Sequence, residues 1–364
     1  MTTDGVRSQT TTIRSGHEID REALQRYLGD HLPGFSLPGR STVEGGLEIR
    51  QFEGGQSNPT YLLHTSERDY VLRKKPPGQL LPSAHQVDRE YRVMTALRER
   101  GIPVPRTRLL CVDESILGTS FFVMDCVDGR VFRQPHLPGV SPEERAVMYD
   151  DMAAVLARLH AVDVAAAGLA DYGKPGNYYA RQIGRWSRQY VAAKTHEIAA
   201  MDRLMEWLPA HIPPGDETTI AHGDYRVENL IFHPTEPRVA AIVDWELSTL
   251  GHPLADLAYN CLTYHLAPEA LGRVTGSEEV LAKAGDRRGL PGEAEYVAAY
   301  CRRTGRPGVA NWNFYLAFSM FRLASILQGV YARGLQGNAA SAQALQRGAA
   351  ARQIADRAWV TATS

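Results

Sequence analysis

The segment from Ala221 to Glu246, AHGDYRVENLIFHPTEPRVAAIVDWE, constrains the fold of this chain more than any other stretch. It surrounds two apolar runs, LIF and VAAIV, with the polar residues His222, Asp224, Asn229 and Asp244. Apolar strands disfavour charge at their ends unless a cation or a substrate receives it. We therefore expect two short strands with a polar site beside them.

The length and charge of the chain narrow the class of protein. A chain of 364 residues is too long for one small core, so we expect two lobes. Hydrophobic residues make up 44% and charged residues 22%, as in an ordinary globular protein. With 40 basic against 41 acidic residues, we expect neither nucleic acid nor a membrane as a partner. The oligomeric state stays open.

The four cysteines are widely spaced and form no C-x-x-C pair, so neither a zinc site nor a disulfide framework is predicted. A reducing, cytoplasmic compartment fits this usage best. No apolar run reaches the length of about 18 residues that a membrane span requires. Residues 1–16 are polar and lack the apolar core of a signal peptide, so we expect a flexible tail there.

Residue periodicity predicts an α+β fold in two lobes. Residues 17–126 are expected to form the N-terminal lobe, a small antiparallel sheet with one main helix over 84–100. Its strand-like runs lie at 47–55, 60–66, 69–75, 106–114 and 120–126. Residues 127–364 are expected to form a larger, mostly helical lobe. Helical spacing appears there at 142–163, 178–194, 253–266, 294–305 and 311–334.

HGDYRVEN has the H-x-D-x-x-x-x-N spacing of a kinase catalytic loop, with Gly223 where protein kinases have Arg. In that chemistry Asp224 accepts the proton of a substrate hydroxyl, and Asn229 offers an amide oxygen to Mg²⁺. We assign His222 to the same catalytic site. Asp244 ends the second apolar run and would supply a carboxylate ligand to the metal. Because these ligands are hard oxygen atoms, we expect Mg²⁺ rather than zinc. The alternative is a polar hairpin with a buried, hydrogen-bonded histidine.

The N-terminal lobe carries candidate nucleotide-binding groups. The turn GGQSNPTYLL could bring the backbone N–H groups of Ser57 and Asn58 close to phosphates. Period-two alternation from Val71 puts Arg73 on the same strand face, where it would hold the nucleotide phosphates. Glu90, on the following helix, is its expected partner. The alternative is an ordinary surface pair.

FFVMDCVDG at the lobe junction is typical of a hinge. The backbone groups of Asp125 and Val127 could hydrogen-bond an adenine there. A plain edge strand is the alternative interpretation.

HGDYRVEN, IVDWE and HPLADLAYN, in this order, resemble the aminoglycoside-phosphotransferase-like family of small-molecule kinases. The resemblance runs from about Gly45 to the end of the chain. It implies a protein-kinase-like bilobal fold, with ATP and Mg²⁺ as cofactors. It also implies that Asp256 supports the catalytic loop, with an exposed helix carboxylate as the alternative.

Within that family, three stretches look most like the kinase-like domain that some organisms fuse to an acyl-CoA dehydrogenase. They are GGQSNPTYLL, YVLRKKPPGQLLPSAHQVDREYRVMTAL and GKPGNYYARQIGRWSRQY. This resemblance implies phosphorylation of a hydroxyacyl-CoA, and we expect the kinase-like part alone, ending at Ser364. Arg73 stands where most of the wider family has Lys. It keeps the charge but adds a planar fork, so the geometry of phosphate binding can differ.

Several rival functions remain to be compared. A protein kinase is disfavoured, because no A-P-E motif and no long activation segment separate Asp244 from Asp256. An aminoglycoside acceptor would call for carboxylates, yet residues 174–194 hold five cations and no Asp or Glu. A non-catalytic, nucleotide-binding pseudokinase scaffold is a further alternative. The expected function is ATP- and Mg²⁺-dependent phosphorylation of a small-molecule hydroxyl, and the sequence does not distinguish ATP from GTP.

On a helix, Arg181, Arg185 and Arg188 would share one face. This face favours an anionic acceptor such as an acyl-CoA. An amphipathic helix with a solvated basic side is the alternative.

Overall fold

The computed structural model describes residues 5–35, 47–53, 58–76, 86–266, 288–336 and 347–364, and they form two compact units. The first unit comprises Met1–Phe132, Ala165–Tyr172 and Asn229–Leu247. The second comprises Arg133–Val164, Gly173–Glu228 and Ser248–Ser364. The units therefore do not coincide with a single division after residue 126, because two later segments of the chain belong to the first unit.

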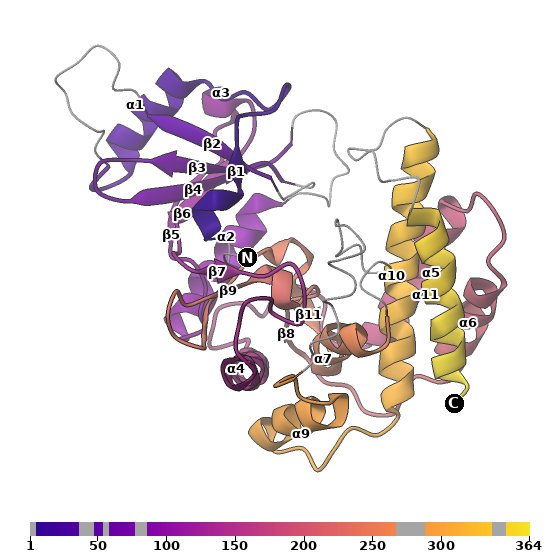
Figure 1. Cartoon of the computed structure of the whole chain (residues 1–364). Coiled ribbons are helices and arrows are strands. Elements are labelled where there is room, and N and C mark those ends of the chain that lie inside the picture. The colour runs from indigo at the N-terminus through magenta and orange to yellow at the C-terminus, as the bar shows by residue number, and fades with distance from the viewer. Residues whose placement is uncertain (1–4, 36–46, 54–57, 77–85, 267–287, 337–346) are drawn as a thin grey trace. The chain divides into compact units, whose positions relative to one another are not determined.

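The first unit is built on a six-stranded antiparallel sheet in the order β1-β2-β3-β4-β6-β5 (Figure 1). The strands are β1 (Thr10–Thr11), β2 (Glu48–Phe52), β3 (Thr60–His64), β4 (Asp69–Lys74), β5 (Thr107–Cys111) and β6 (Phe121–Asp125). Tyr61, Leu72 and Val123 are in register across three neighbouring strands, so their side chains share one face of the sheet. That face packs on helix α1 (Arg21–His31) and forms a core of the unit.

The opposite face of the sheet carries Arg73, because side chains alternate along a strand. Arg73 on β4 is in register with Thr60 on β3 and Phe122 on β6. Helix α2 (Val87–Glu99) contacts β5 and β6 in the same unit, and its Tyr91 ring meets Phe122 edge-on. The short helix α3 (Glu114–Leu117) joins β5 to β6.

The expected flexible tail over residues 1–16 is corrected for the part that the structure describes. Val6–Gln9 form a 3-10 helix, η1, and β1 pairs with β2 at the edge of the sheet. The side chain of Arg50 on β2 donates to the hydroxyl of Thr10 at 2.8 Å. An edge strand needs backbone hydrogen bonds on one side only, so a polar segment without hydrophobic alternation can form one.

A second, three-stranded sheet in the first unit has the order β10-β9-β7. Its strands are β7 (Arg130–Val131), β9 (Leu230–Phe232) and β10 (Val239–Ile242), followed by the 3-10 helix η3 (Trp245–Leu247). The two apolar runs of the predicted polar segment are thus the strands β9 and β10. Gly129 lies so close to this sheet that a Cβ atom there would stand 2.3 Å from the carbonyl oxygen of Phe232. Only glycine fits this position.

The second unit is mostly helical, as the sequence predicts. Its helices are α4 (Pro142–His160), α5 (Tyr178–Ala192), α6 (Ala199–Ala210), α7 (Pro253–Cys261), α9 (Glu293–Thr304), α10 (Trp312–Leu335) and α11 (Arg347–Ala362). Two short 3-10 helices are η2 (Val227–Asn229) and η4 (Leu262–Tyr264). The last residue of η2, Asn229, already belongs to the first unit. A two-stranded sheet pairs β8 (Thr219–Ala221) with β11 (Thr249–Gly251).

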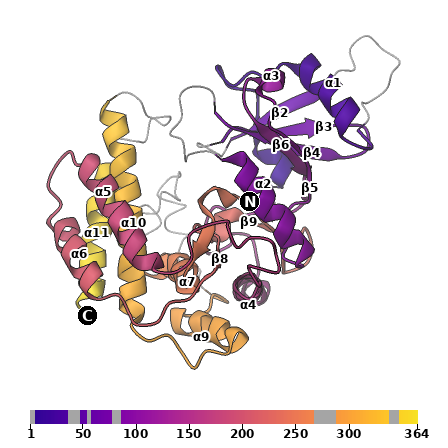
Figure 2. The ribbon, with the colours of Figure 1, turned by 180° about the vertical axis from the view of Figure 1, so that it is seen from behind.

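Helix α10 is the centre of this unit. Helices α5 and α11 lie along it in both views, and α7 also packs on it (Figures 1 and 2). Nearly every side chain of α10 from Phe314 to Gln328 is buried, because the helix is apolar almost all round. Within the described residues, no helix is both long enough and apolar enough to cross a membrane.

Candidate active site

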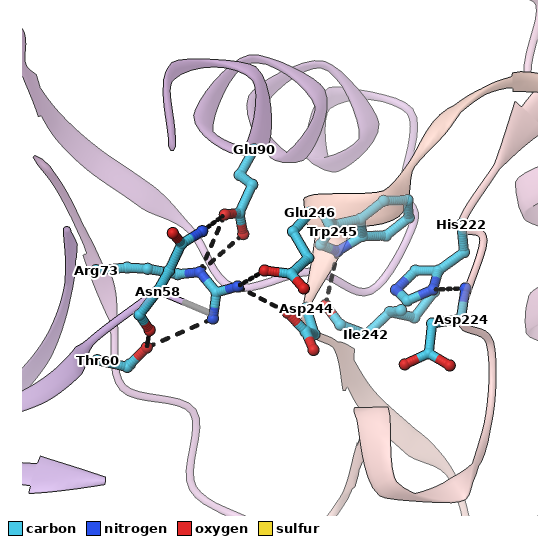
Figure 3. A network of polar contacts seen from close by, with 10 residues as sticks. All are labelled: Asn58, Thr60, Arg73, Glu90, His222, Asp224, Ile242, Asp244, Trp245 and Glu246. Atoms are coloured by element: carbon cyan, nitrogen blue, oxygen red, sulfur yellow. Dashed lines mark hydrogen bonds and ion pairs between the residues drawn. The ribbon is translucent and has the colours of Figure 1, made fainter. Parts of the chain in front are cut away.

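Arg73 is the centre of a buried polar network in the first unit (Figure 3). Its Nε atom lies 2.9 Å and 3.1 Å from the two carboxylate oxygens of Glu90. Its Nη2 atom donates to Asp244 at 2.7 Å, and Glu246 accepts more weakly at 3.4 Å. The predicted pair of Arg73 and Glu90 therefore exists, and Arg73 also binds Asp244, the aspartate that ends the second apolar run.

The network is not a surface ion pair. Arg73 is 7% exposed and Glu90 is 2% exposed, so the alternative of an ordinary surface pair is wrong. The side chain of Asn58 donates to Glu90 at 2.8 Å and helps to satisfy the buried carboxylate. Because a buried charge is costly unless it is paired and hydrogen-bonded, this arrangement fixes the guanidinium in place.

Arg73 keeps its charge in this environment. Burial alone would lower the pKa of the guanidinium, but the carboxylates of Glu90, Asp244 and Glu246 raise that pKa above its ordinary value. The planar fork presents different nitrogen atoms to different carboxylates, which a single ammonium group could not do in the same geometry.

Asn229 and Asp244 lie at the same end of the β9–β10 hairpin. Leu230 is paired with Ile242, and the amide of Val243 donates to the carbonyl oxygen of Asn229 at 2.9 Å. Asp244 follows directly, in a left-handed conformation with a φ of 67°. This backbone region is unusual for a residue other than glycine and is often found at functional sites.

The donor set at this end of the hairpin fits a magnesium ion. It offers the amide oxygen of Asn229 and the carboxylate of Asp244, whose side chain is 35% exposed. Among the described residues, no group of three His, Cys, Asp or Glu side chains could hold a metal ion. Magnesium bound together with nucleotide phosphates does not need one, because one or two protein oxygens are sufficient.

In the second unit, Asp256 on α7 fixes the backbone of the predicted catalytic loop. Its carboxylate accepts the amide of His222 at 2.6 Å and that of Gly223 at 2.8 Å. Asp256 is 1% exposed, so the alternative of an exposed helix carboxylate is wrong. Gly223 has a φ of 83°, which explains a glycine where protein kinases carry arginine.

His222 lies beneath the loop and is fully buried. Its Nδ1 atom accepts the amide of Asp224 at 3.2 Å, which Figure 3 shows. The side chain of Asp224 is 13% exposed, with the Nε atom of Arg226 3.3 Å away. His222 therefore positions the backbone of Asp224, and the Asp224 carboxylate is the candidate reacting group.

Three supporting residues of this loop were missed from the sequence. The Nε2 atom of His160 lies 3.3 Å from Asp256, and its Nδ1 atom lies 2.7 Å from the hydroxyl of Tyr300. Although burial alone would raise the pKa of Asp256, His160 and the loop amides hold that pKa below its usual value. Burial raises the pKa of Tyr259 to about 12, and Asp224, which accepts a hydrogen bond from Tyr259, adds to this shift.

Little in the sequence distinguishes these helical residues from ordinary core residues. His160 is the last residue of α4, a helix with many buried side chains, and Tyr259 and Tyr300 lie among apolar neighbours on α7 and α9. The role of His160 depends on Asp256, which is more than 90 residues away in sequence. Residue spacing within a single helix cannot predict such a contact.

The other predicted nucleotide contacts have mixed outcomes. Ser57 lies outside the described residues. The amide of Asp125 donates to Arg106 at 2.8 Å, and its carboxylate pairs with Arg108 at 2.7 Å. Strand β6 lies between β4 and β5, so the alternative of an edge strand is wrong. Val127 follows the strand and packs with a small apolar cluster, and a role for its backbone in binding adenine stays a prediction.

The predicted basic face of α5 divides into different environments. Arg181 donates to the carbonyl groups of Lys174 and Pro175 and so secures the start of the helix. The guanidinium of Arg185 lies 5.2 Å from the centre of the Trp186 ring. Arg188 is exposed, as the alternative of a solvated side expects. The three arginines are therefore not one uniform surface.

Residues 48–311 match the model of the phosphotransferase enzyme family, which is more than two thirds of the chain. The chain belongs to this family. Within the match lie the Arg73 network, the loop from His222 to Asn229, and Asp256.

The relatives of this family member include much longer proteins. Acyl-CoA dehydrogenase family member 10 of Mus musculus is 46% identical over 354 residues, which cover 97% of this chain and 32% of the relative. Acyl-CoA dehydrogenase family member 11 of Rattus norvegicus is 45% identical over 338 residues, 92% of this chain and 42% of the relative. The chain thus spans about a third to two fifths of the length of these relatives. The expected resemblance to their kinase-like domain is confirmed.

Solved structures establish the fold of this family member. A protein of Ralstonia eutropha JMP134, provisionally described as an aminoglycoside phosphotransferase, is 48% identical with a TM-score of 0.81. The match covers 95% of this chain and 99% of that one. Spectinomycin phosphotransferase, solved with ADP and spectinomycin, shares the fold at 13% identity and a TM-score of 0.60, over 94% of this chain and 98% of that one. The expected α+β, kinase-like fold is confirmed.

Proposed function

We propose that this protein transfers the terminal phosphoryl group of ATP to a hydroxyl group of a small molecule, in a magnesium-dependent reaction. The observation that supports this most directly is the network in which Arg73 joins the helix carboxylate Glu90 to Asp244. A cation on a sheet strand, a helix glutamate and a metal-binding aspartate are the parts that kinases use to place nucleotide phosphates.

The second unit supplies the proposed base. Asp224 accepts the proton of the acceptor hydroxyl as that oxygen attacks the phosphorus atom. Asp256 holds the loop amides before Asp224, and His222 holds the amide of Asp224 itself, so the carboxylate is positioned before the acceptor binds. Preorganisation of this kind lowers the cost of reaching the reactive geometry.

The first unit supplies the proposed metal ligands. Asn229 and Asp244 would hold the ion through one amide oxygen and one carboxylate, as the hairpin places them. When bound, magnesium neutralises charge on the phosphate oxygens. Arg73 would bind those phosphates with a donor that the present network already orients, and Asn58 would keep Glu90 in place beneath it.

The acceptor that we propose is an anionic, hydroxylated acyl thioester of the acyl-CoA class. The family members named as acyl-CoA dehydrogenases support this choice, as does the absence of carboxylates from residues 174–194. An aminoglycoside is the alternative acceptor, favoured by the name of the Ralstonia eutropha protein. A polycation would meet Arg185 rather than a carboxylate on α5.

The test measures ADP release and the phosphorylated product by mass spectrometry, with hydroxyacyl-CoAs and kanamycin offered in parallel. Asp224→Asn should lower kcat by at least about 100-fold, the lower end for loss of a general base. Asp356→Asn changes an exposed aspartate on α11 and serves as the matched control, with activity near that of the wild type. Near-normal turnover by Asp224→Asn would contradict the assignment of the base.

A further inference from the structure

Arg322, in the middle of α10, is a buried cation in the second unit, and none of the residues that the structure describes gives it a partner of opposite charge. It is 5% exposed and lies on a helix that is apolar almost all round. Among the residues that the structure describes, no carboxylate forms an ion pair with Arg322, and its Nε atom has no hydrogen-bond acceptor. Proteins rarely bury an arginine in this way, because a buried charge is normally paired or bound to a ligand.

Aromatic rings, rather than acceptors, surround the guanidinium of Arg322. Its central carbon lies 5.5 Å from the centre of the Trp186 ring on α5 and 5.2 Å from that of Tyr259 on α7. Such contacts stabilise a cation through the ring faces but leave its N–H donors unused. Three packed helices thus hold a guanidinium whose hydrogen-bonding capacity is not satisfied by the described residues.

A second arginine stands on the same indole. The guanidinium of Arg185 lies 5.2 Å from the Trp186 ring. Although Arg185 is exposed as a residue, partial burial of its guanidinium lowers its pKa, and repulsion by Arg322 lowers it further. Two like charges against one ring repel each other in the free protein. An anion bound beside these guanidinium groups would offset this repulsion and would accept hydrogen bonds from their N–H donors.

The candidate carboxylates nearby are already engaged. Asp256 is committed to the amides of His222 and Gly223 and to His160. Asp224 pairs with Arg226. Since these carboxylates are engaged, we take the missing anion to be a ligand rather than one of the described side chains of this unit.

Tyr259 connects this pair of arginines to the proposed base. Its ring faces Arg322, and its hydroxyl donates to Asp224. One tyrosine side chain therefore lies between the guanidinium of Arg322 and the carboxylate of Asp224. An acceptor with its hydroxyl at Asp224 can reach Arg322 with another part of the same molecule.

We propose that Arg322 and Arg185, with Trp186 and Tyr259 as walls, form a subsite that binds an anionic group of the acceptor, a phosphate or a carboxylate. This proposal rests on the proposed function and names residues that would select the acceptor. A phosphate of CoA and the carboxylate of a free hydroxy acid share the required chemistry. The subsite excludes polycationic acceptors, because two guanidinium groups repel them.

The experiment measures binding by isothermal titration calorimetry, without ATP. The probes are CoA, 3-hydroxybutyryl-CoA, 3-hydroxybutyrate and inorganic phosphate. Arg322→Met should weaken the favoured probe by about 10-fold to 100-fold, as expected for loss of a charge-assisted bidentate contact. Arg185→Met, at an exposed position, should weaken it less. The control Arg333→Met removes an exposed arginine of the same helix and should bind like the wild type.

Thermal unfolding separates a binding role from a structural one. If Arg322 serves a ligand, Arg322→Met should unfold at the same or a higher temperature than the wild type, because an unpaired buried charge is removed. A large drop in melting temperature, or unchanged affinity in both variants, would overturn the subsite. So would failure of the wild type to bind any anionic probe.

The outcomes also distinguish this subsite from the kinase activity. If binding depends on Arg322 but no ATP is consumed, the subsite stands and the proposed function falls. If wild type and Arg322→Met phosphorylate a neutral or cationic alcohol equally well, the proposed function stands and the subsite falls. Preference for CoA and 3-hydroxybutyryl-CoA over 3-hydroxybutyrate would identify the anion as a phosphate, and the opposite order a carboxylate.

Discussion

Arg73 uses separate nitrogen atoms for separate carboxylates, and this division requires a planar guanidinium. Nε donates to Glu90 and Nη2 donates to Asp244, while Nη1 lies 3.4 Å from the hydroxyl oxygen of Thr60. A lysine at this position could approach one carboxylate closely, but its single nitrogen could not maintain both contacts with the same backbone. The arginine thus sets the position of the proposed metal ligand as well as the charge for the nucleotide.

For this reason Arg73→Lys should reduce ATP use although the charge is conserved. Loss of one charge-assisted hydrogen bond of about 1.5–3 kcal/mol corresponds to a rise in KM for ATP of roughly 10-fold to 100-fold. Steady-state kinetics with varied ATP measure this value, and the KM for the acceptor should change little. Arg26→Lys, on the exposed side of α1, is the control. A normal KM for ATP in Arg73→Lys would show that the fork is not needed.

Helix α7 begins with an unusual cap, the imidazole of His252. Its Nδ1 atom accepts the amide of Leu254 at 3.3 Å, which requires that nitrogen to be unprotonated. Burial lowers the pKa of His252 to about 4, against the partial support that Glu217 gives to the charged form. Asp256, which binds the amides of the catalytic loop, lies on the first turn of the same helix. Protonation of His252 would therefore also disturb the helix turn that supports this loop.

The pH dependence of stability follows from that pKa. An unfolded histidine takes up a proton near pH 6.5, while the folded one resists until about pH 4, so stability is lost as pH falls through this window. The expected loss is about 2 kcal/mol at pH 5. His252→Asn retains a cap without a titrating group and should lose less stability between pH 7 and pH 5.

Urea unfolding of wild type and variant at the two pH values measures this difference. His211→Asn, which removes a surface imidazole from the same unit, is the matched control. Equal pH dependence of wild type and His252→Asn would show that the cap does not titrate in this range.

Site residues could be predicted where a local sequence pattern identifies them, but not where contacts between distant segments determine their role. Alternation along one strand was enough to predict the face of Arg73, and the kinase pattern, which pairs a strand cation with a helix glutamate, then predicted Glu90. The loop residues Asp224 and Asn229 followed from a fixed local spacing. Arg322 and His160 could not be found in this way, because their neighbours come from helices far apart in sequence. The strand β1 was missed because an edge strand of threonines has no hydrophobic period.

The whole molecule distributes the proposed roles over its two units, which predicts a separation of effects. Mg²⁺ with ATP at 100 times its dissociation constant should stabilise the protein by about 2.7 kcal/mol. Asp244→Ala, in the first unit, should remove the magnesium-dependent part of this gain. Asp224→Asn, in the second, should retain it while losing turnover. Thermal unfolding with and without Mg²⁺ measures both, and loss of nucleotide stabilisation in Asp224→Asn would contradict this division.

The assignment of Asn229–Leu247 to the first unit has a consequence for the newly made chain. Arg73 and Asp244 are separated by 171 positions, so the arginine is synthesised long before its partner. At about 5–20 residues per second, the delay on the ribosome is roughly 10–30 s. During that time the sheet with Arg73 and Glu90 lacks its aspartate. We therefore expect the first unit to complete its native structure only after much of the second has been translated, although its strands are the first to emerge.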